Sequence, residues 1–173
     1  MHYTQTISSP LGNILLSADE VGLTGLWFDR GRYYAETLPE EHVERETPIL
    51  MDTKRWLDVY FTGREPDFTP PLHPTGSPFR QTVWQLLLEI PYGQTTTYGE
   101  LAKRLECGRM SAQAVGGAVG HNPISIIVPC HRVVGTNGSL TGYAGGLDRK
   151  IRLLEIEQTD MHGLFRPKKG TAI

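Results

Sequence analysis

The chain has 173 residues, of which 39% are hydrophobic and 21% are charged, and its formal net charge is −2. This length is enough to bury a core as one domain or two small ones, whereas no segment approaches the roughly 18 apolar residues of a membrane span and the N-terminus lacks a signal-peptide pattern, so we expect a cytoplasmic protein. The two cysteines, Cys107 and Cys130, provide no disulfide framework, and no Cys or His pair has zinc-finger spacing.

The first 61 residues predict a small sheet with one helix against it. Residues 3–8 alternate polar and apolar side chains, and residues 14–18 and 23–28 are largely apolar, with turn residues between the three segments. This pattern predicts a β-meander. Apolar side chains then recur at helical spacing over residues 47–61 behind the cap candidate Thr47, which predicts an amphipathic helix that covers the sheet.

Five prolines between residues 63 and 78 mark a boundary in the chain. Such a stretch sustains neither helix nor sheet, and we interpret it as a stiff linker between two domains. Ser77 and Pro78 then open a helix whose apolar side chains recur until Ile90, where Pro91 follows. We interpret this helix as scaffold.

Residues 97–120 predict a pair of helices joined by a short turn. Thr97 caps the first helix and Glu100 completes a capping box, while Ser111 begins the second helix, which is rich in Ala and Gly. Small side chains let a helix backbone approach a DNA groove closely. The alternative is that they only permit tight packing against the scaffold helix.

The segment 126–135 reads IIVPCHRVVG. Its two β-branched runs predict buried strand, and the chain must turn between them because Pro129 has no N–H to donate to a ladder. Cys130 is a candidate nucleophile at this turn, since an imidazole and a guanidinium beside a sulfur favour thiolate. The alternative is an inert core thiol, which is how we interpret Cys107.

Charge is distributed unevenly along the chain. Residues 1–78 carry a net charge of −6, and residues 79–173 carry +4. A cationic second half suits a phosphate backbone, although an ordinary solvated surface explains a charge of this size equally well.

Five segments of the second half together resemble the O6-alkylguanine-DNA alkyltransferase family: residues 90–102, 114–118, 121–123, 128–135 and 141–147. The resemblance covers nearly all of residues 78–157, and residues 9–12 are similar to the start of that family's N-terminal domain. It implies an α/β (α+β) fold. A ribonuclease H-like sheet domain (1–76) would precede a mainly helical domain with a helix-turn-helix (77–165) and a tail (166–173).

The resemblance also implies the activity. Such a protein repairs DNA by moving the alkyl group from O6-alkylguanine, and from O4-alkylthymine, irreversibly to its own Cys130. His131 would act on the thiol through a water molecule, Glu157 would orient the imidazole, and Asn122 would brace the turn. Without the resemblance, Glu157 is an ordinary solvated position on an amphipathic helix.

The same resemblance implies a set of DNA-binding residues: Tyr98, Ser111, Gln113, Ala114, Gly117, Arg132 and Tyr143. Tyr98 would press on the phosphate beside a flipped base and Tyr143 would line the base pocket, the alternative for both being core packing. Gln113 departs from the family, since many members carry an arginine there that fills the space left by the base. We expect double-stranded DNA containing O6-alkylguanine as partner, a monomer, no membrane association, no cofactor and no metal.

Two other functions compete with this interpretation. One is a non-catalytic helix-turn-helix protein that binds alkylated DNA, although such proteins lack the acceptor cysteine that Cys130 supplies. The other is a Cys-His-Glu hydrolase, which explains neither the paired helices nor Tyr98 and Gln113.

Overall fold

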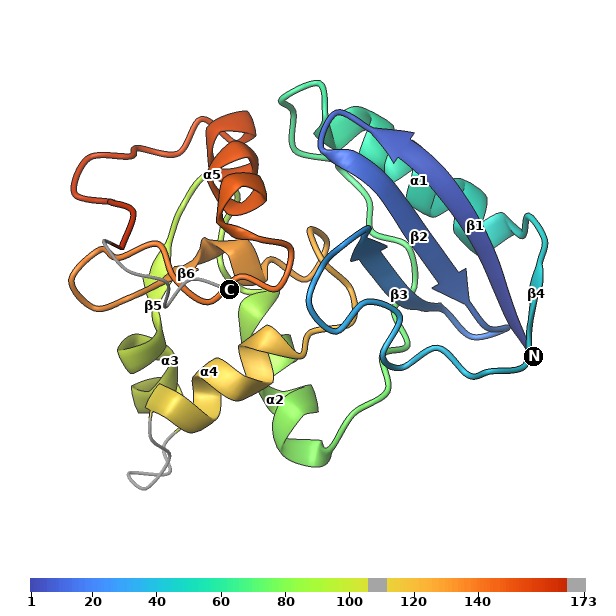
Figure 1. Ribbon diagram of the computed structural model, residues 1–173, viewed down its shortest axis with the longest axis horizontal. Coiled ribbons are helices and arrows are strands. Elements are labelled where there is room, and N and C mark those ends of the chain that lie inside the picture. The colour runs from blue at the N-terminus through green and yellow to red at the C-terminus, as the bar shows by residue number, and fades with distance from the viewer. Residues whose placement is uncertain (106–111, 168–173) are drawn as a thin grey trace.

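The computed structural model describes residues 1–105 and 112–167 (Figure 1). Strands β1 (His2–Ser9), β2 (Gly12–Ala18) and β3 (Leu23–Phe28) form the predicted antiparallel meander. β4 (His42–Glu44) pairs in parallel with β1, so the strand order is β3-β2-β1-β4. The sequence does not predict β4, because its three exposed residues lie at an edge and show no buried face.

Helix α1 (Pro48–Tyr60) packs against this sheet, as its amphipathic pattern predicts (Figure 1). It begins where the Thr47 hydroxyl accepts a hydrogen bond from the Leu50 amide at 3.3 Å. The buried face of α1 carries five side chains: Leu50, Thr53, Trp56, Leu57 and Tyr60. Tyr60 lies at the C-terminal end of the helix, which directs its ring toward the second half of the chain.

The proline-rich segment after α1 is packed along the edge of β3, whereas the sequence predicted a stiff linker. The Leu23 amide donates to the Pro71 carbonyl at 2.7 Å, and the His73 amide donates to the Leu23 carbonyl at the same distance. Further along β3, Leu26 pairs in the same way with residues 123–125. Both halves therefore meet at one strand edge, and a single hydrophobic cluster runs from the sheet to the helices of the second half.

The second half begins with three helices, α2 (Pro78–Leu87), α3 (Tyr98–Arg104) and α4 (Ala112–Gly120). α3 and α4 form the predicted helix pair and α2 packs against α4, where the Trp84 indole donates to the Ala118 carbonyl at 2.9 Å. α2 ends three residues earlier than the predicted Ile90, which is held in a turn before Pro91. The predicted helix end at Cys107 and start at Ser111 lie outside the described residues.

The expectation of buried strand on both sides of Pro129 is correct on one side only. Residues 126–128 form turns, and Ile126 has a left-handed φ of 70°. After the 3₁₀ helix η1 (Cys130–Arg132), β6 (Val133–Val134) pairs in parallel with β5 (Thr96–Thr97). The first run is held in these turns by main-chain bonds from Ile127 to Ser125 and from Val128 to Ile124, and the amide side chain of Asn122 binds the Val128 carbonyl at 2.8 Å.

Helix α5 (Leu147–Ile156) closes the fold and is fastened to the sheet by Arg149. Its guanidinium donates to the main-chain oxygens of Leu11 and Asp29 at 2.9 and 2.6 Å and pairs with the Asp29 carboxylate. It also lies over the Phe28 ring, 4.7 Å from the centroid. Among the described helices, none is long and apolar enough to cross a membrane.

Replacing Arg149 with Met tests this fastening. The methionine keeps much of the stem but leaves acceptors of Leu11 and Asp29 unpaired, which costs about 1–3 kcal/mol. We expect a loss in thermal midpoint of roughly 2–4 °C for each kcal/mol, measured by circular dichroism. Arg152→Met, which removes an exposed guanidinium from the same helix, is the control. Equal midpoints for the two variants would contradict the assignment.

Candidate active site

Cys130 lies at the start of η1, and only 6% of its surface is exposed. The side chain of Asn122 holds the turn in front of it, donating to the carbonyls of Ile124 and Val128 and accepting from the Ile124 amide at 3.0 Å. Burial raises the pKa of the Cys130 thiol, and the Asn122 hydrogen bond, the Lys150 charge and main-chain N–H groups offset this only in part. The resting side chain is therefore a neutral thiol.

His131 is completely buried beside this thiol and contacts Glu157, with 2.6 Å between Nε2 and Oε2. Burial lowers the pKa of His131, so its imidazole is neutral near pH 7. Because the carboxylate accepts a hydrogen bond, Nε2 carries the proton and Nδ1 keeps its lone pair. In the described part of the chain Nδ1 has no hydrogen-bond partner, which leaves it able to accept a proton.

Glu157 is 2% exposed, so it is not a solvated position on an amphipathic helix. Besides His131, it accepts from the Tyr60 hydroxyl at 2.7 Å, the Gly93 amide at 3.0 Å, and Nε and Nη2 of Arg132 at 2.9 and 3.1 Å. Burial by itself raises the pKa of Glu157, but the hydrogen bonds and charges of His131 and Arg132 outweigh it and hold that pKa well below its usual range. The group is a permanent carboxylate.

The resemblance implies that Arg132 contacts DNA, whereas in the structure its charged group is bound within the protein. Its guanidinium points inward, where it binds Glu157 twice and donates to the Ile90 carbonyl at 2.7 Å. A buried carboxylate needs a counter-charge, and only 10% of the Arg132 side chain is exposed. Arg132 therefore neutralises Glu157 behind the site.

A groove between the helix pair and the loop 135–142 contains two of the predicted DNA-binding residues, Tyr98 and Gln113. The Tyr98 hydroxyl donates to the Thr141 carbonyl at 3.1 Å, and burial raises the pKa of that hydroxyl. Gln113 is exposed on α4, as are Ala114 and Gly117. The predicted Ser111 lies outside the described residues.

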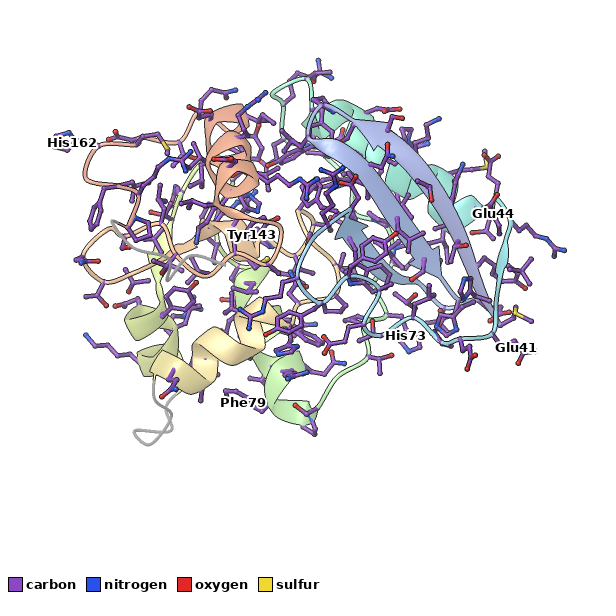
Figure 2. All side chains as sticks on the ribbon, viewed as in Figure 1. Glu41, Glu44, His73, Phe79, Tyr143 and His162 are labelled. Carbon is purple, nitrogen blue, oxygen red and sulfur yellow. The ribbon has the colours of Figure 1, made fainter. Side chains whose placement is uncertain are left out.

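Tyr143 is 2% exposed. In the view of Figure 2 its side chain lies between α4 and α5. Its ring meets that of His131 edge-on, with 6.5 Å between the ring centroids. A Cβ atom at Gly145 would lie 2.6 Å from the Tyr143 ring, so only glycine fits at that position. The structure thus brings Tyr143 to the imidazole of His131, whereas the sequence alone also allowed Tyr143 to be a core residue.

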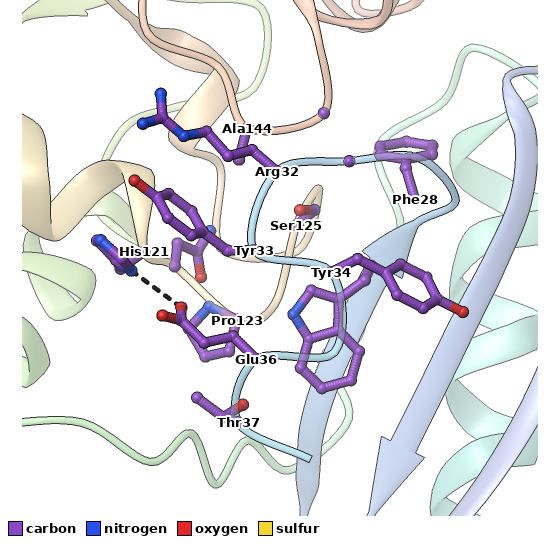
Figure 3. Close-up of a pocket in the computed structure, with 14 residues that line it drawn as sticks. Phe28, Arg32, Tyr33, Tyr34, Glu36, Thr37, His121, Pro123, Ser125 and Ala144 are labelled. Atoms are coloured by element: carbon purple, nitrogen blue, oxygen red, sulfur yellow. Dashed lines mark hydrogen bonds and ion pairs between the residues drawn. The ribbon is translucent and has the colours of Figure 1, made fainter. Parts of the chain in front are cut away.

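The loop between β3 and β4 forms a second hollow at the edge of the site (Figure 3). Tyr33 stacks on His121, which pairs with Glu36 at 2.9 Å, and the Arg32 amide donates to the Ala144 carbonyl at 2.8 Å. The sheet half therefore reaches the loop that carries Tyr143. Within residues 1–105 and 112–167, no three His, Cys, Asp or Glu side chains gather as metal ligands.

Sequence reasoning missed three contributors to the site: Tyr60, Gly93 and Lys150. Tyr60 resembles any aromatic residue on the core face of a helix, and Gly93 acts through its main-chain amide, so neither gives a sequence signal. Lys150 does give one, because it precedes Leu153 and Leu154 by three and four residues and so falls on the buried face of α5.

Comparisons with known proteins cover almost the whole chain. Residues 1–74 match the model for the ribonuclease-like domain of 6-O-methylguanine DNA methyltransferase, and residues 78–159 match the model for its DNA-binding domain. A methylated-DNA–protein-cysteine methyltransferase of Methanosarcina acetivorans is 48% identical over 155 residues, covering 90% of this chain and 97% of the relative. The chain is also similar to Mycobacterium tuberculosis OGT in complex with DNA, with 41% identity, a TM-score of 0.80, and coverage of 90% and 92%.

Replacing Glu157 with Gln tests the carboxylate network. The amide leaves Arg132 as a buried charge without a counter-charge, which typically costs about 3–5 kcal/mol. We expect the thermal midpoint to fall by roughly 2–4 °C for each kcal/mol. Glu155→Gln makes the same change at an exposed position of α5 and serves as control. If both variants melt like the unmodified protein, the network does not hold the fold.

Proposed function

The chain belongs to the 6-O-methylguanine DNA methyltransferase family, and we propose that Cys130 is its alkyl acceptor, with His131, Glu157 and Asn122 supporting it. The protein repairs DNA by moving the alkyl group from O6-alkylguanine in duplex DNA to a cysteine of its own. One observation carries the assignment: the buried thiol directly precedes in the chain a buried, neutral imidazole whose Nδ1 has no partner among the described residues and can take up a proton.

The transfer requires one proton to move and one bond to be exchanged. The thiol proton of Cys130 passes through a water molecule to Nδ1 of His131, while Glu157 stabilises the resulting imidazolium. The sulfur then forms a bond to the alkyl carbon, the bond from that carbon to O6 breaks, and its electron pair goes to O6. The base takes up one proton and becomes ordinary guanine. This uptake equals the one proton that the Cys130 thiol loses. The thioether product is stable, which makes the protein a single-turnover reagent.

DNA recognition is assigned to the helix pair. We place the exposed face of α4, with Gln113, Ala114 and Gly117, in the DNA groove. A flipped base would then enter the groove lined by Tyr98 and Gln113 and reach Tyr143 and Cys130. The net charge of +4 on residues 79–173 favours a phosphate backbone, and the acidic first half supports the site from behind.

Three further proposals concern the whole chain. Residues 1–76 and 77–165 act as two domains with a tail at 166–173, and the protein works as a monomer. It acts in the cytoplasm, since the acceptor must remain a reduced thiol and reducing compartments keep thiols in that form. The non-catalytic alternative has no support in the site, because a protein that only binds DNA needs no proton acceptor beside a buried thiol.

Replacing Cys130 with Ser tests the acceptor. After incubation with a duplex that contains O6-methylguanine, intact-mass measurement should show one added methyl group on the unmodified protein and none on Cys130→Ser. Gel-shift binding to the same duplex should persist, because binding depends on α4 and on phosphate contacts. Cys107→Ser is the matched control and should gain one methyl group. Uptake by Cys130→Ser, or more than one equivalent of repaired guanine per protein, would sink the assignment.

Replacing Gln113 with Arg tests the place of this residue in the DNA stack. A guanidinium adds a charge and a flat surface where the flipped base leaves a gap, so we expect tighter binding to the alkylated duplex. Gln85→Arg adds the same charge on the exposed surface of α2 and controls for general attraction to phosphate. The idea fails if Gln113→Arg and Gln85→Arg change the dissociation constant equally.

A further inference from the structure

Lys150 is a completely buried lysine that the reaction described above does not use. Its ammonium donates to two main-chain carbonyls, that of Val133 at 2.6 Å and that of Thr141 at 2.7 Å. Among residues 1–105 and 112–167, no carboxylate forms an ion pair with it. Arg132, the other buried cation of the site, is by contrast paired with Glu157.

A buried positive charge without a counter-charge is costly, because carbonyl dipoles replace only part of its hydration. Burial lowers the pKa of Lys150 to about 8, and the charge of Cys130 opposes this shift. Lys150 therefore still carries its proton in most molecules at pH 7. Neutral donors can bind main-chain carbonyls without burying a charge, so the charge of Lys150 itself needs an explanation.

The two carbonyls that Lys150 binds belong to the segments that build the site. Val133 directly follows η1 and its nucleophile. Thr141 precedes the loop that carries Tyr143, and its carbonyl also accepts the Tyr98 hydroxyl. α5 contacts η1, so Lys150 reaches both segments from the helix that ends beside Glu157 (Figure 1). One ammonium thereby fixes the acceptor relative to the base-binding loop.

Cys130 is the titratable group whose negative charge favours this ammonium. Each group favours the charged form of the other: Lys150 lowers the pKa of the thiol, and Cys130 raises the pKa of the ammonium. Three other titratable groups interact with this pair: Tyr98 from α3, Tyr143 from the loop after Thr141, and His131. Glu157 and Arg132 in turn act on the imidazole of His131. The thiolate is the counter-charge that Lys150 lacks in the resting protein.

We propose that Lys150 is a positioning residue for alkyl transfer, which clamps the segments on both sides of the base pocket and provides the positive charge that a thiolate at Cys130 requires. The proposal rests on Cys130 being the acceptor. Lys150 touches neither the alkyl group nor the guanine. The thiolate of Cys130 is the counter-charge of Lys150. It exists from the transfer of the thiol proton to His131 until the new S–C bond removes the negative charge from the sulfur.

Lys150→Met tests the charge, with Arg152→Met as control, both in a Cys107→Ser background. We expect Lys150→Met to bind the O6-methylguanine duplex as the control does, since Lys150 has no exposed surface, but to transfer the methyl group about tenfold more slowly at pH 7. The pH of half-maximal Cys130 alkylation by iodoacetamide should rise by about one unit, because one pKa unit is a tenfold change in thiolate. A purely structural lysine would leave this pH unchanged, and that result would overturn the proposal.

A measurement on the unmutated protein decides the question even where Lys150→Met does not fold. The ¹³Cε signal of Lys150 is titrated by NMR before and after methyl transfer from the duplex. S-methylcysteine cannot ionise, so the step in the Lys150 titration that reports ionisation of the Cys130 thiol should be absent after transfer; an identical titration before and after transfer would count against the pairing. Failure of the acceptor assignment remains distinguishable, because it appears as methyl uptake by Cys130→Ser.

Discussion

Five hydrogen bonds converge on the buried carboxylate of Glu157, and the rest of the site depends on them. They come from the hydroxyl of Tyr60, the amide of Gly93, the imidazole of His131 and two nitrogens of Arg132. Because a carboxylate without partners is too costly to bury, each donor must be in place before the charge is stable. This single group therefore sets the tautomer of the His131 imidazole and fixes three segments around it: the end of α1, the turn at Gly93 and η1.

The same carboxylate explains why an acidic sheet half accompanies a DNA-binding half. Tyr60 ends α1, so the helix that covers the sheet also supplies a donor to the network 97 residues further along the chain. Arg149 and the edge of β3 fasten the two halves at separate points. The sheet half contributes no group to the bond that is exchanged. Its contribution is to hold the carboxylate, and through it His131, in a fixed orientation.

Two buried cations serve the site in different ways. Arg132 is paired at all times, since its planar guanidinium matches the carboxylate of Glu157 in a forked geometry. Lys150 is a compact charge that binds neutral carbonyls, and it has a counter-charge only while Cys130 is ionised. Burial keeps the resting thiol protonated, whereas the charge of Lys150 favours the ionised form in the reaction. A buried, neutral cysteine is thereby protected until a substrate arrives.

The sequence by itself determined the features that depend on neighbours along the chain: the meander, the caps Thr47, Ser77 and Thr97, and the helix pair. It also indicated Cys130 as the candidate nucleophile, because Pro129 forces a turn and the two residues after Cys130 are polar. Only the tertiary structure decided that residues 126–128 turn and that Arg132 points inward, since Asn122 and Glu157 satisfy them from outside their segments. The partners of Tyr60 and Lys150 likewise lie too far along the chain for local periodicity to indicate them, because a buried charge selects its donors in space rather than in sequence.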